Sequence, residues 1–584
     1  IQSTFSAEIE HKLGVDKRAD YGSNMSCLSR AERKILLEPY LTEARVNWAH
    51  IAIATMMDAG YVDRVLTFNF DSVLARACGL LGLYPATYDF AVAPSAETSY
   101  IASPAIVHLH GQGYGMVMLN SDEETLRHAE NLRPLLRRVL NEAPLLVIGY
   151  SGAADAVFPV IEDEFQRQQR LYWALYEESV DPAVKAFINK GGRTSEALCG
   201  ADSDRFLMEL ARELGCFPPK LFSDPYGHLL DELNPVCEYP LNADRQQDIR
   251  RGLRERLRAA QSAQVAARES KPDLEELMMR GDLDGVVEHA DPENPEDREL
   301  LAWAFIMQGN ALDAQARSKN GAEADALWQQ AFDRYVRAVE IRPDKHDSFY
   351  NWGNALAAQA GRKESAEADE LRHAAFEKYA RAVEIKPDMH EAFNNWGVAL
   401  DVQARRKEGA EADALWQEAF EKYARAVEIK PDKHWALNNW GNALAEQARR
   451  KEGTEADALW QAAFEKYARA VEIKPDMYEA FDNWSTALIH QSYRESDAEK
   501  RSLILNEAVA KCKRTCRLKP GLGTYNLACI ESLRGDLPKS LAWLEETRAL
   551  GMLNPDHMMK DRDLEALRAS EIFKDWQARH FPGR

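Results

Sequence analysis

The chain has 584 residues, and at about 100–200 residues per domain this length indicates several domain-sized units. Hydrophobic residues make up 45% and charged residues 29% of the chain, a globular composition that excludes extensive disorder. The formal net charge of −21 disfavours non-specific binding to nucleic acid or to an anionic membrane surface. No apolar run approaches the ~18 residues of a membrane span, so we expect a soluble protein.

Cysteine usage points to a reducing compartment. The eight Cys residues form no Cys-x-x-Cys pair, so the sequence predicts neither a structural zinc site nor a disulfide framework, and a cytoplasmic location fits best. The chain starts at Ile1 without a signal-peptide pattern, and we expect that its native beginning is missing.

In the N-terminal part, short apolar runs alternate with amphipathic segments. Continuous apolar strands joined by helices predict an α/β domain with a Rossmann-like parallel sheet covered on both faces. The predicted strands are 65–68, 105–109, 145–148 and 171–175, and the clearest predicted helices are 47–59 and 124–140.

Polar clusters follow three of these strands. Asn69 and Asp71 follow the first, His110-Gly111 the second, and Gly149-Tyr150-Ser151 the third. Because ligands of such sheets bind beyond the carboxyl ends of the strands, we expect the three clusters to form one site.

These clusters, in this order, resemble the sirtuin family of NAD-consuming enzymes, particularly its bacterial branch without a zinc module. The resemblance covers about residues 1–220. It rests on Thr67-Phe68-Asn69-Phe70-Asp71, on Leu109-His110-Gly111, and on Gly149-Tyr150-Ser151 with Asp155.

The resemblance implies a role for each residue. Asn69 would hold a ribose hydroxyl or the attacking water, Asp71 would lie on the nicotinamide side, and His110 would be the general base, since imidazole titrates near neutral pH. NAD is then the substrate, and no metal is expected. The residues expected to bind NAD are Thr67, Gly111, Gly149, Ser151 and Asp155.

Structural alternatives exist for single residues of this set. A histidine that ends a strand often has a structural role, and Asn-x-Asp is a common cap between strand and helix. His108 shares the strand face of His110 but lies further from the carboxyl end, so we expect it to be structural.

Two features of the family are absent from this sequence. Its opening Gly-Ala-Gly phosphate loop is not found, and we expect that the chain begins after it. The Cys-x-x-Cys pairs of zinc-containing protein deacylases are also absent, which favours NAD cleavage over deacylation.

A local basic segment separates this domain from the C-terminal half. Six arginines lie between Arg245 and Arg258, in a predicted linker over 226–272. In a chain of net charge −21, we expect them to contact an acidic surface of the C-terminal half or another subunit. A solvated linker helix is the alternative.

The C-terminal half repeats with a period of 44 residues, which marks stacked supersecondary units. The segment Ala419, Tyr423, Ala426 and Pro431 resembles the second half of the tetratricopeptide repeat, although about 34 residues are usual there. We therefore expect an all-α tetratricopeptide-repeat solenoid over 273–584, with Gly397 allowing close packing of helices. Residues that recur at this period include Pro343, Pro387, Pro431, Pro475, Trp352, Trp396, Trp440 and Trp484.

An asparagine precedes each repeat tryptophan. In peptide-binding members of the repeat family, this residue faces the concave groove and bonds the backbone of an extended ligand. The alternative is that these amides bond neighbouring helices or persist from repeat duplication. The candidates for partner binding are Asn351, Asn395, Asn439 and Asn483.

Together these patterns predict an NAD+ glycohydrolase, residues 1–225, controlled by the repeat array. By resemblance, such bacterial fusions act in antiviral defence by depleting NAD. The array would recognise a protein or peptide trigger, or mediate assembly into a homo-oligomer or hetero-complex. An NAD-dependent protein deacylase and a non-catalytic NAD-sensing protein are the alternatives.

Overall fold

The computed structural model describes residues 30–92, 99–110, 122–150, 157–166, 169–175, 182–191, 194–200, 202–237, 248–270, 272–519 and 521–581. Contacts divide the chain into two compact units, Ile1–Gly285 and Val286–Arg584.

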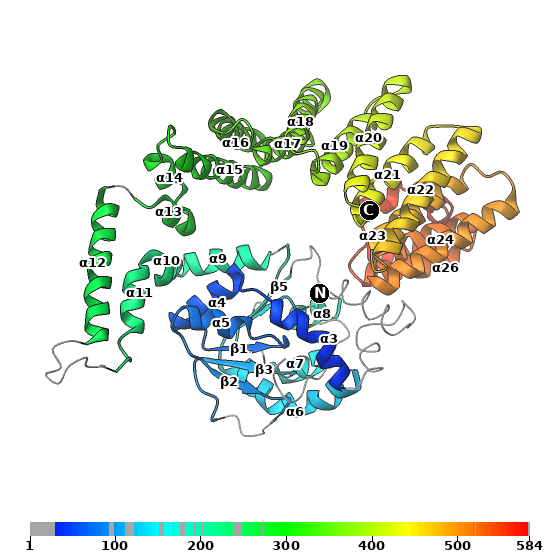
Figure 1. Ribbon diagram of the computed structural model, residues 1–584. Helices are drawn as coiled ribbons and strands as arrows, with labels where there is room; N and C mark the ends of the chain where they lie inside the picture. Colours follow the sequence, from blue (N-terminus) through cyan, green and yellow to red (C-terminus); the bar gives the residue numbers. More distant parts are fainter. Residues whose placement is uncertain are drawn as a thin grey trace. The chain divides into compact units, whose positions relative to one another are not determined.

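The first unit contains two three-stranded parallel sheets, in the orders β1-β3-β2 and β4-β5-β6 (Figure 1). In the first sheet Thr67 and Asp89 both lie opposite His108, so the three strands end at the same level. The predicted parallel sheet is thereby confirmed. The strands are β1 (Arg64–Thr67), β2 (Ala86–Asp89), β3 (Ala105–His108), β4 (Leu145–Ile148), β5 (Leu171–Ala174) and β6 (Ser195–Leu198).

Helices cover the sheets on both faces. One hydrophobic cluster joins α6, α7 and α8 to inward residues of both sheets, and a second joins α4, α5 and α9 to the opposite faces. β1 and β4 contribute to both clusters, so the two sheets are parts of one layer. These helices are α4 (Trp48–Asp58), α5 (Val73–Leu80), α6 (Asp122–Glu142), α7 (Phe158–Glu164), α8 (Pro182–Gly191) and α9 (Ser203–Glu213).

The start of α4 follows directly from the sequence. The side chain of Asn47 accepts a hydrogen bond from the backbone N–H of His50 at 3.1 Å, which satisfies one of the unpaired donors of the first turn. The remaining helices of this unit are α3 (Arg30–Glu43), α10 (Lys220–Ser223), α11 (Pro225–Glu232), α12 (Ile249–Ser270), α13 (Leu274–Arg280) and, at the boundary, α14 (Leu283–His289).

The arginine-rich segment forms α12, which contacts α11 within the first unit. Gln261 donates to Asp224 at 2.9 Å, and the guanidinium of Arg250 donates to the carbonyl of Asn234 at 2.8 Å. Contact with the acidic array or with another subunit stays a prediction.

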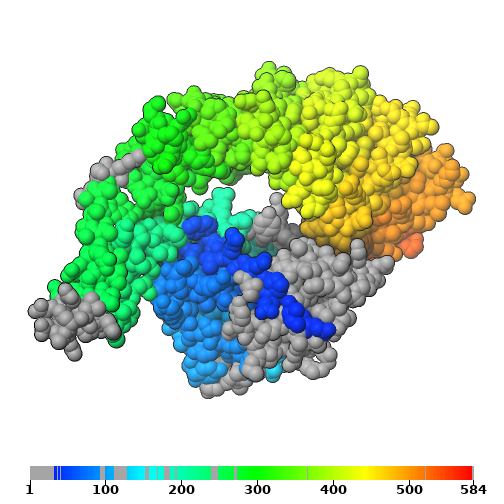
Figure 2. All heavy atoms as spheres, in the orientation of Figure 1, coloured from blue at the N-terminus to red at the C-terminus, as the bar shows by residue number. Residues whose placement is uncertain are grey.

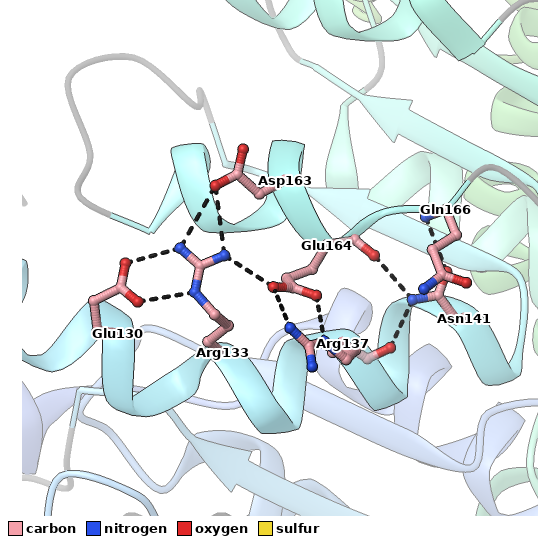
Figure 3. A network of polar contacts seen from close by, with 7 residues as sticks. All are labelled: Glu130, Arg133, Arg137, Asn141, Asp163, Glu164 and Gln166. Carbon is pink, nitrogen blue, oxygen red and sulfur yellow. Dashed lines mark hydrogen bonds and ion pairs between the residues drawn. The ribbon is translucent and has the colours of Figure 1, made fainter.

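A buried carboxylate ties α6 to α7 (Figure 3). The side chain of Glu164 is only 8% exposed and accepts from Arg133 at 2.8 Å and from Arg137 at 2.7 Å. Arg133 also donates two hydrogen bonds of 2.8 Å to Glu130. The hydrogen bond from Arg137 is the main cause that lowers the pKa of Glu164 to about 2.

The second unit is a row of antiparallel helix pairs, which Figure 1 shows in chain order and Figure 2 shows as one continuous arc of atoms from green through yellow to orange. In each pair, the first helix in the chain is called the A helix and the second the B helix. The six pairs are α15 (Pro295–Ser318) with α16 (Gly321–Ile341), α17 (His346–Ala360) with α18 (Ser365–Ile385), α19 (His390–Ala404) with α20 (Gly409–Ile429), α21 (His434–Arg449) with α22 (Gly453–Ile473), α23 (Tyr478–Ser492) with α24 (Ala498–Leu518), and α25 (Thr524–Arg534) with α26 (Leu537–Ala549). Short elements close the unit: α27 (Pro555–Lys560), η2 (Arg562–Leu564), α28 (Glu565–Arg568) and α29 (Glu571–His580).

A glycine in four of the A helices explains how closely each pair packs. A Cβ on Gly397 would lie 2.8 Å from Cε1 of Tyr423, which is closer than carbon atoms approach without a shift. The predicted role of Gly397 is confirmed. The other pairs with this contact are Gly309 with Tyr335, Gly353 with Tyr379, and Gly441 with Tyr467.

The repeat tryptophans of the A helices carry a lysine from the following B helix on one ring face. The ammonium of Lys422 lies 4.0 Å from the ring centroid of Trp396, and that of Lys466 lies 3.9 Å from Trp440. Burial lowers the pKa of Lys466 below its usual value. The recurring Lys of the B helices therefore packs within its own repeat.

Within the described residues, no helix is both long and apolar enough to cross a membrane.

Candidate active site

The turn after β1 presents the first cluster. Asn69, two residues beyond the strand, is exposed, and its backbone N–H donates to Oγ1 of Thr67 at 3.0 Å. Thr67 thus fixes the backbone on which Asn69 sits. The side-chain amide of Asn69 is left on the surface at the carboxyl end of the strand, where a ligand can reach it.

Asp71 lies two residues before α5, next to the N-cap residue Ser72. Its Oδ1 accepts from the backbone N–H of Val73, the first residue of α5, at 3.0 Å. This Asx turn satisfies one of the unpaired donors of the first turn of α5, close to the capping role that an Asn-x-Asp sequence suggests. Asp71 is half-buried, and its second carboxylate oxygen makes no hydrogen bond with the described residues, so one oxygen stays available to a ligand.

Two histidines at the end of β3 differ in their surroundings. His108 is 3% exposed, and its Nδ1 donates to the backbone carbonyl of Asn69 at 3.0 Å. This bond ties the end of β3 to the turn after β1. The predicted structural role of His108 agrees with this position.

His110 lies beyond the strand end, with rings on two sides. Its ring centroid is 4.9 Å from that of Phe68 and 6.5 Å from that of His128. His128, on α6, donates from Nε2 to the carbonyl of Leu109 at 2.9 Å, and burial lowers its pKa below the usual value. His128 therefore holds the backbone just before His110, and the lowered pKa favours its neutral form.

The contacts between rings continue along the strand ends. Phe68 stacks on Tyr150 at 5.0 Å between centroids, and Tyr150 stacks on Trp173 at 5.7 Å. The indole N–H of Trp173 donates to the carbonyl of Tyr150 at 2.8 Å. These ring contacts connect the carboxyl ends of β1, β3, β4 and β5. They run, in order, through His128, His110, Phe68, Tyr150 and Trp173.

Gly149 supplies the third strand end. Its φ is +67°, in the left-handed region, while a Cβ added there would meet no atom within 4 Å. The backbone conformation therefore selects glycine at this position. The other residues predicted to bind NAD, Gly111, Ser151 and Asp155, lie outside the described residues.

The structure thus brings Asn69, His110 and Gly149 to adjoining strand ends, and Phe68 and Tyr150 are the side chains that connect them. Sequence reasoning did not assign a role to either ring. Both rings stand inside the motifs that carry the resemblance. Their position between the polar residues was the signal in the sequence that could have identified them. His128 had no signal of this kind, because it lies on a helix distant in sequence.

The repeat asparagines are used between neighbouring A helices. Three of the four candidate amides donate a hydrogen bond to the preceding repeat. This agrees with the alternative interpretation, in which these amides bond neighbouring helices. For Asn351, no such bond is found among the described residues, and a role in partner binding stays a prediction for all four. The bonded pairs, donor first, are Asn395 with Asn354 at 3.0 Å, Asn439 with Asn394 at 3.2 Å, and Asn483 with Asn438 at 3.1 Å.

Sequence models of two known families match the chain, one within each unit. Residues 63–192 match the sequence model of the SIR2-like domain family. Residues 369–488 match that of the plant-specific mitochondrial import receptor subunit TOM20. No curated protein matches the chain.

Two solved structures resemble the chain at low identity. One is YrrB, described as a tetratricopeptide-repeat protein with an unusual peptide-binding site. It is 17% identical, with 38% of this chain and 94% of YrrB covered, at a TM-score of 0.26. The other is a monomeric mutant of IFIT1 with Gppp-AAAA, 14% identical, with 63% of this chain and 75% of that chain covered, at a TM-score of 0.29.

Proposed function

Because the chain carries a SIR2-like domain joined to a tetratricopeptide-type helical array, we propose that it cleaves NAD+ to nicotinamide and ADP-ribose under the control of that array. The observation that supports this most directly is the position of His110. It lies at the carboxyl end of β3, against Phe68 and beside the turn that presents Asn69. A base and a polar amide at adjoining strand ends suit hydrolysis of a bound nucleotide.

The proposed reaction breaks the bond between nicotinamide and C1′ of the ribose. Nicotinamide leaves with the bonding electron pair, and the ribose becomes oxocarbenium-like. Water adds to C1′ and gives up one proton, so NAD+ and water yield nicotinamide, ADP-ribose and a proton. Positioning and electrostatic support are the main requirements of such a step.

In this proposal His110 accepts the proton of the attacking water, and Asn69 holds that water or a ribose hydroxyl. Asp71 uses the oxygen that does not cap α5 to face the nicotinamide side. Thr67 positions Asn69 through the turn, and Gly149 lets the backbone approach the dinucleotide. We assign Gly111, Ser151 and Asp155 to the same binding site on the resemblance of their motifs alone.

The test is to incubate the purified full chain with NAD+ and to measure nicotinamide and ADP-ribose by liquid chromatography. We expect His110→Ala to lower the rate by about 100- to 10,000-fold, the range for loss of a general base. His373→Ala is the matched control, since that imidazole is 76% exposed on the array. Intact NAD+ in every oligomeric and trigger condition would exclude the enzyme.

The products also separate the alternatives. Formation of O-acetyl-ADP-ribose from an acetylated peptide would identify a protein deacylase instead. Calorimetric binding of NAD+ without any product would identify a non-catalytic sensor.

We place this activity in antiviral defence, in which a protein or peptide trigger bound by the array releases NAD cleavage and depletes the infected cell. The support is the fusion of a SIR2-like domain with an array in one chain. Cells that express the wild-type protein should resist infection and lose NAD, and cells with His110→Ala should do neither. Equal resistance with the two proteins would show that NAD depletion is not the cause of the resistance.

A further inference from the structure

Three potential metal ligands meet where the array ends, and a fourth, His557, lies beside them. Cys529 lies on α25, His557 on α27, and Asp561 and Asp563 lie on either side of the start of η2. The thiol sulfur and one carboxylate oxygen from each aspartate all lie within 4.8 Å of one another. A thiol and two carboxylates from separate segments of the chain thus converge on one point, and the imidazole of His557 borders it.

The spacing of these atoms fits tetrahedral coordination. The Cys529 sulfur lies 3.7 Å from Oδ2 of Asp561, and Nε2 of His557 lies 3.6 Å from the same oxygen. In a tetrahedral zinc site, with bonds of about 2.3 Å to sulfur and about 2.0 Å to nitrogen or oxygen, ligand atoms are about 3.3–3.5 Å apart. These two separations lie within a few tenths of an ångström of that range, and a rotation of the exposed His557 side chain would bring its nitrogen toward the other two ligands.

The charges around the cluster are unbalanced. Within the described residues, no Lys or Arg side chain forms an ion pair with the carboxylate of Asp561 or Asp563; His557 lies 3.6 Å from the Asp561 carboxylate, and Arg568 donates to the Asp561 backbone carbonyl. A divalent cation bound between the two carboxylates would compensate both charges.

The thiol has no hydrogen-bond partner outside this cluster among the described residues. Cys529 is 2% exposed, and its sulfur points at the carboxylate of Asp561. A metal ion bound here would take the sulfur as thiolate, with release of the thiol proton.

Outer hydrogen bonds already hold the carboxylates. The hydroxyl of Tyr525 donates to Oδ2 of Asp561 at 2.7 Å, and the hydroxyl of Tyr493 donates to Oδ1 of Asp563. The backbone N–H of Asp563 donates to Oδ1 of Asp561 at 3.0 Å. Metal-binding carboxylates are commonly oriented by such contacts.

We propose that Cys529, His557, Asp561 and Asp563 bind one zinc ion, which joins α25 to the segment from α27 to η2. A thiolate and an imidazole favour zinc over magnesium or calcium, which take oxygen ligands only. The side chain of His557 is 63% exposed, so the ion has a route from solvent. With His557 turned toward the ion, the protein would fill all four positions around the metal, as in a structural site.

The test uses the full chain without an affinity tag, dialysed against a chelator and then titrated with Co2+ and Zn2+. We expect one equivalent of Co2+ with the visible absorption of tetrahedral cobalt and a thiolate-to-cobalt charge-transfer band, both displaced by Zn2+. Cys529→Ser should abolish the charge-transfer band, whereas Cys199→Ser, at an exposed position in the first unit, should keep it.

Two more variants keep the proposal falsifiable if Cys529→Ser does not fold. Asp563→Asn should lose tight binding of Zn2+, and Tyr525→Phe should weaken it by about 10- to 100-fold, as loss of an outer hydrogen bond does. A folded wild-type protein that binds no Co2+, or a charge-transfer band that survives Cys529→Ser, would overturn the proposal.

Discussion

The ring of His110 lies 4.9 Å from the ring of Phe68, between centroids, at an interplanar angle of 58°. Phe68 comes from the end of β1 and His110 from the end of β3, so this contact sets where the imidazole lies relative to the turn that carries Asn69. Since Phe68 also stacks on Tyr150, one ring orients residues from three strands.

Removal of that ring should therefore impair catalysis through positioning. We expect Phe68→Leu to lower the rate of NAD cleavage by about 10- to 100-fold, since a misplaced catalytic group costs this much. Tyr84→Leu is the control, because Tyr84 in the same unit is 77% exposed. The measurement is the initial rate at saturating NAD+. An unchanged rate in Phe68→Leu would show that His110 does not depend on this contact.

Glu164→Gln should weaken the link between α6 and α7. Hydrogen bonds to a charged group contribute about 1.5–3 kcal/mol, and both arginines lose a charged partner in this variant. We expect faster hydrogen–deuterium exchange in the peptides of α6 and α7. Exchange elsewhere in the chain is the internal control, and a uniform change would point to global unfolding.

The same carboxylate should make this link sensitive to acid. The pKa of Glu164 is about 2 in the folded chain, below the ordinary value of 4.5. The stabilisation is therefore complete above about pH 4.5 and is lost as the pH falls toward 2. Exchange in α6 and α7 should rise over this range in the wild type. In Glu164→Gln the rise should be smaller, and equal profiles would exclude Glu164 as its source.

Gly397→Ala tests the close approach of helices within a repeat. The new methyl group would lie 2.8 Å from Cε1 of Tyr423, and overpacking of this kind costs about 1–3 kcal/mol. Gly252→Ala is the matched control, because Gly252 lies inside α12 with no atom within 4 Å of the added Cβ. We expect a gain of about 0.5–1 kcal/mol there. Thermal unfolding of the two variants should therefore show a loss of stability for Gly397→Ala and a gain for Gly252→Ala.

The asparagines of the A helices need a pair of variants. Asn439→Ala should destabilise the array by about 0.5–1.5 kcal/mol, because it removes the bond to Asn394. Asn351→Ala should leave stability unchanged, since its amide makes no bond with the described residues. Thermal unfolding tests both. Once a partner is known, a loss of affinity in Asn351→Ala would assign that amide to the binding surface directly.

The sequence predicted the regular parts of the fold well. The apolar runs gave β4 at its observed bounds and β1, β3 and β5 within one residue at each end, and the 44-residue period identified the helical array. Two strands, β2 and β6, were missed. They lie at the edges of their sheets and read Ala-Thr-Tyr-Asp and Ser-Glu-Ala-Leu, so neither has the continuous apolar character of a central strand.

The candidate site was predicted in its polar residues and missed in its rings. Asn69 and His110 stand in recognisable motifs, whereas the contact of His110 with His128 depends on how α6 packs on the sheet. The cluster at the end of the array was missed for a similar reason. Cys529 and Asp561 are 32 residues apart, a spacing that matches no common zinc motif, and only the folding of the last helices brings them together.

The glycine–tyrosine contact also sets a unit of length for the array. In each of the four repeats the tyrosine follows its glycine by 26 residues, and the pairs themselves recur every 44. Loss or gain of one whole period would keep each glycine of these four repeats opposite a tyrosine. A length change inside a helix pair would separate the glycine from its tyrosine. The fifth A helix has Ser485 at the glycine position, so the constraint applies to the four glycine-containing repeats.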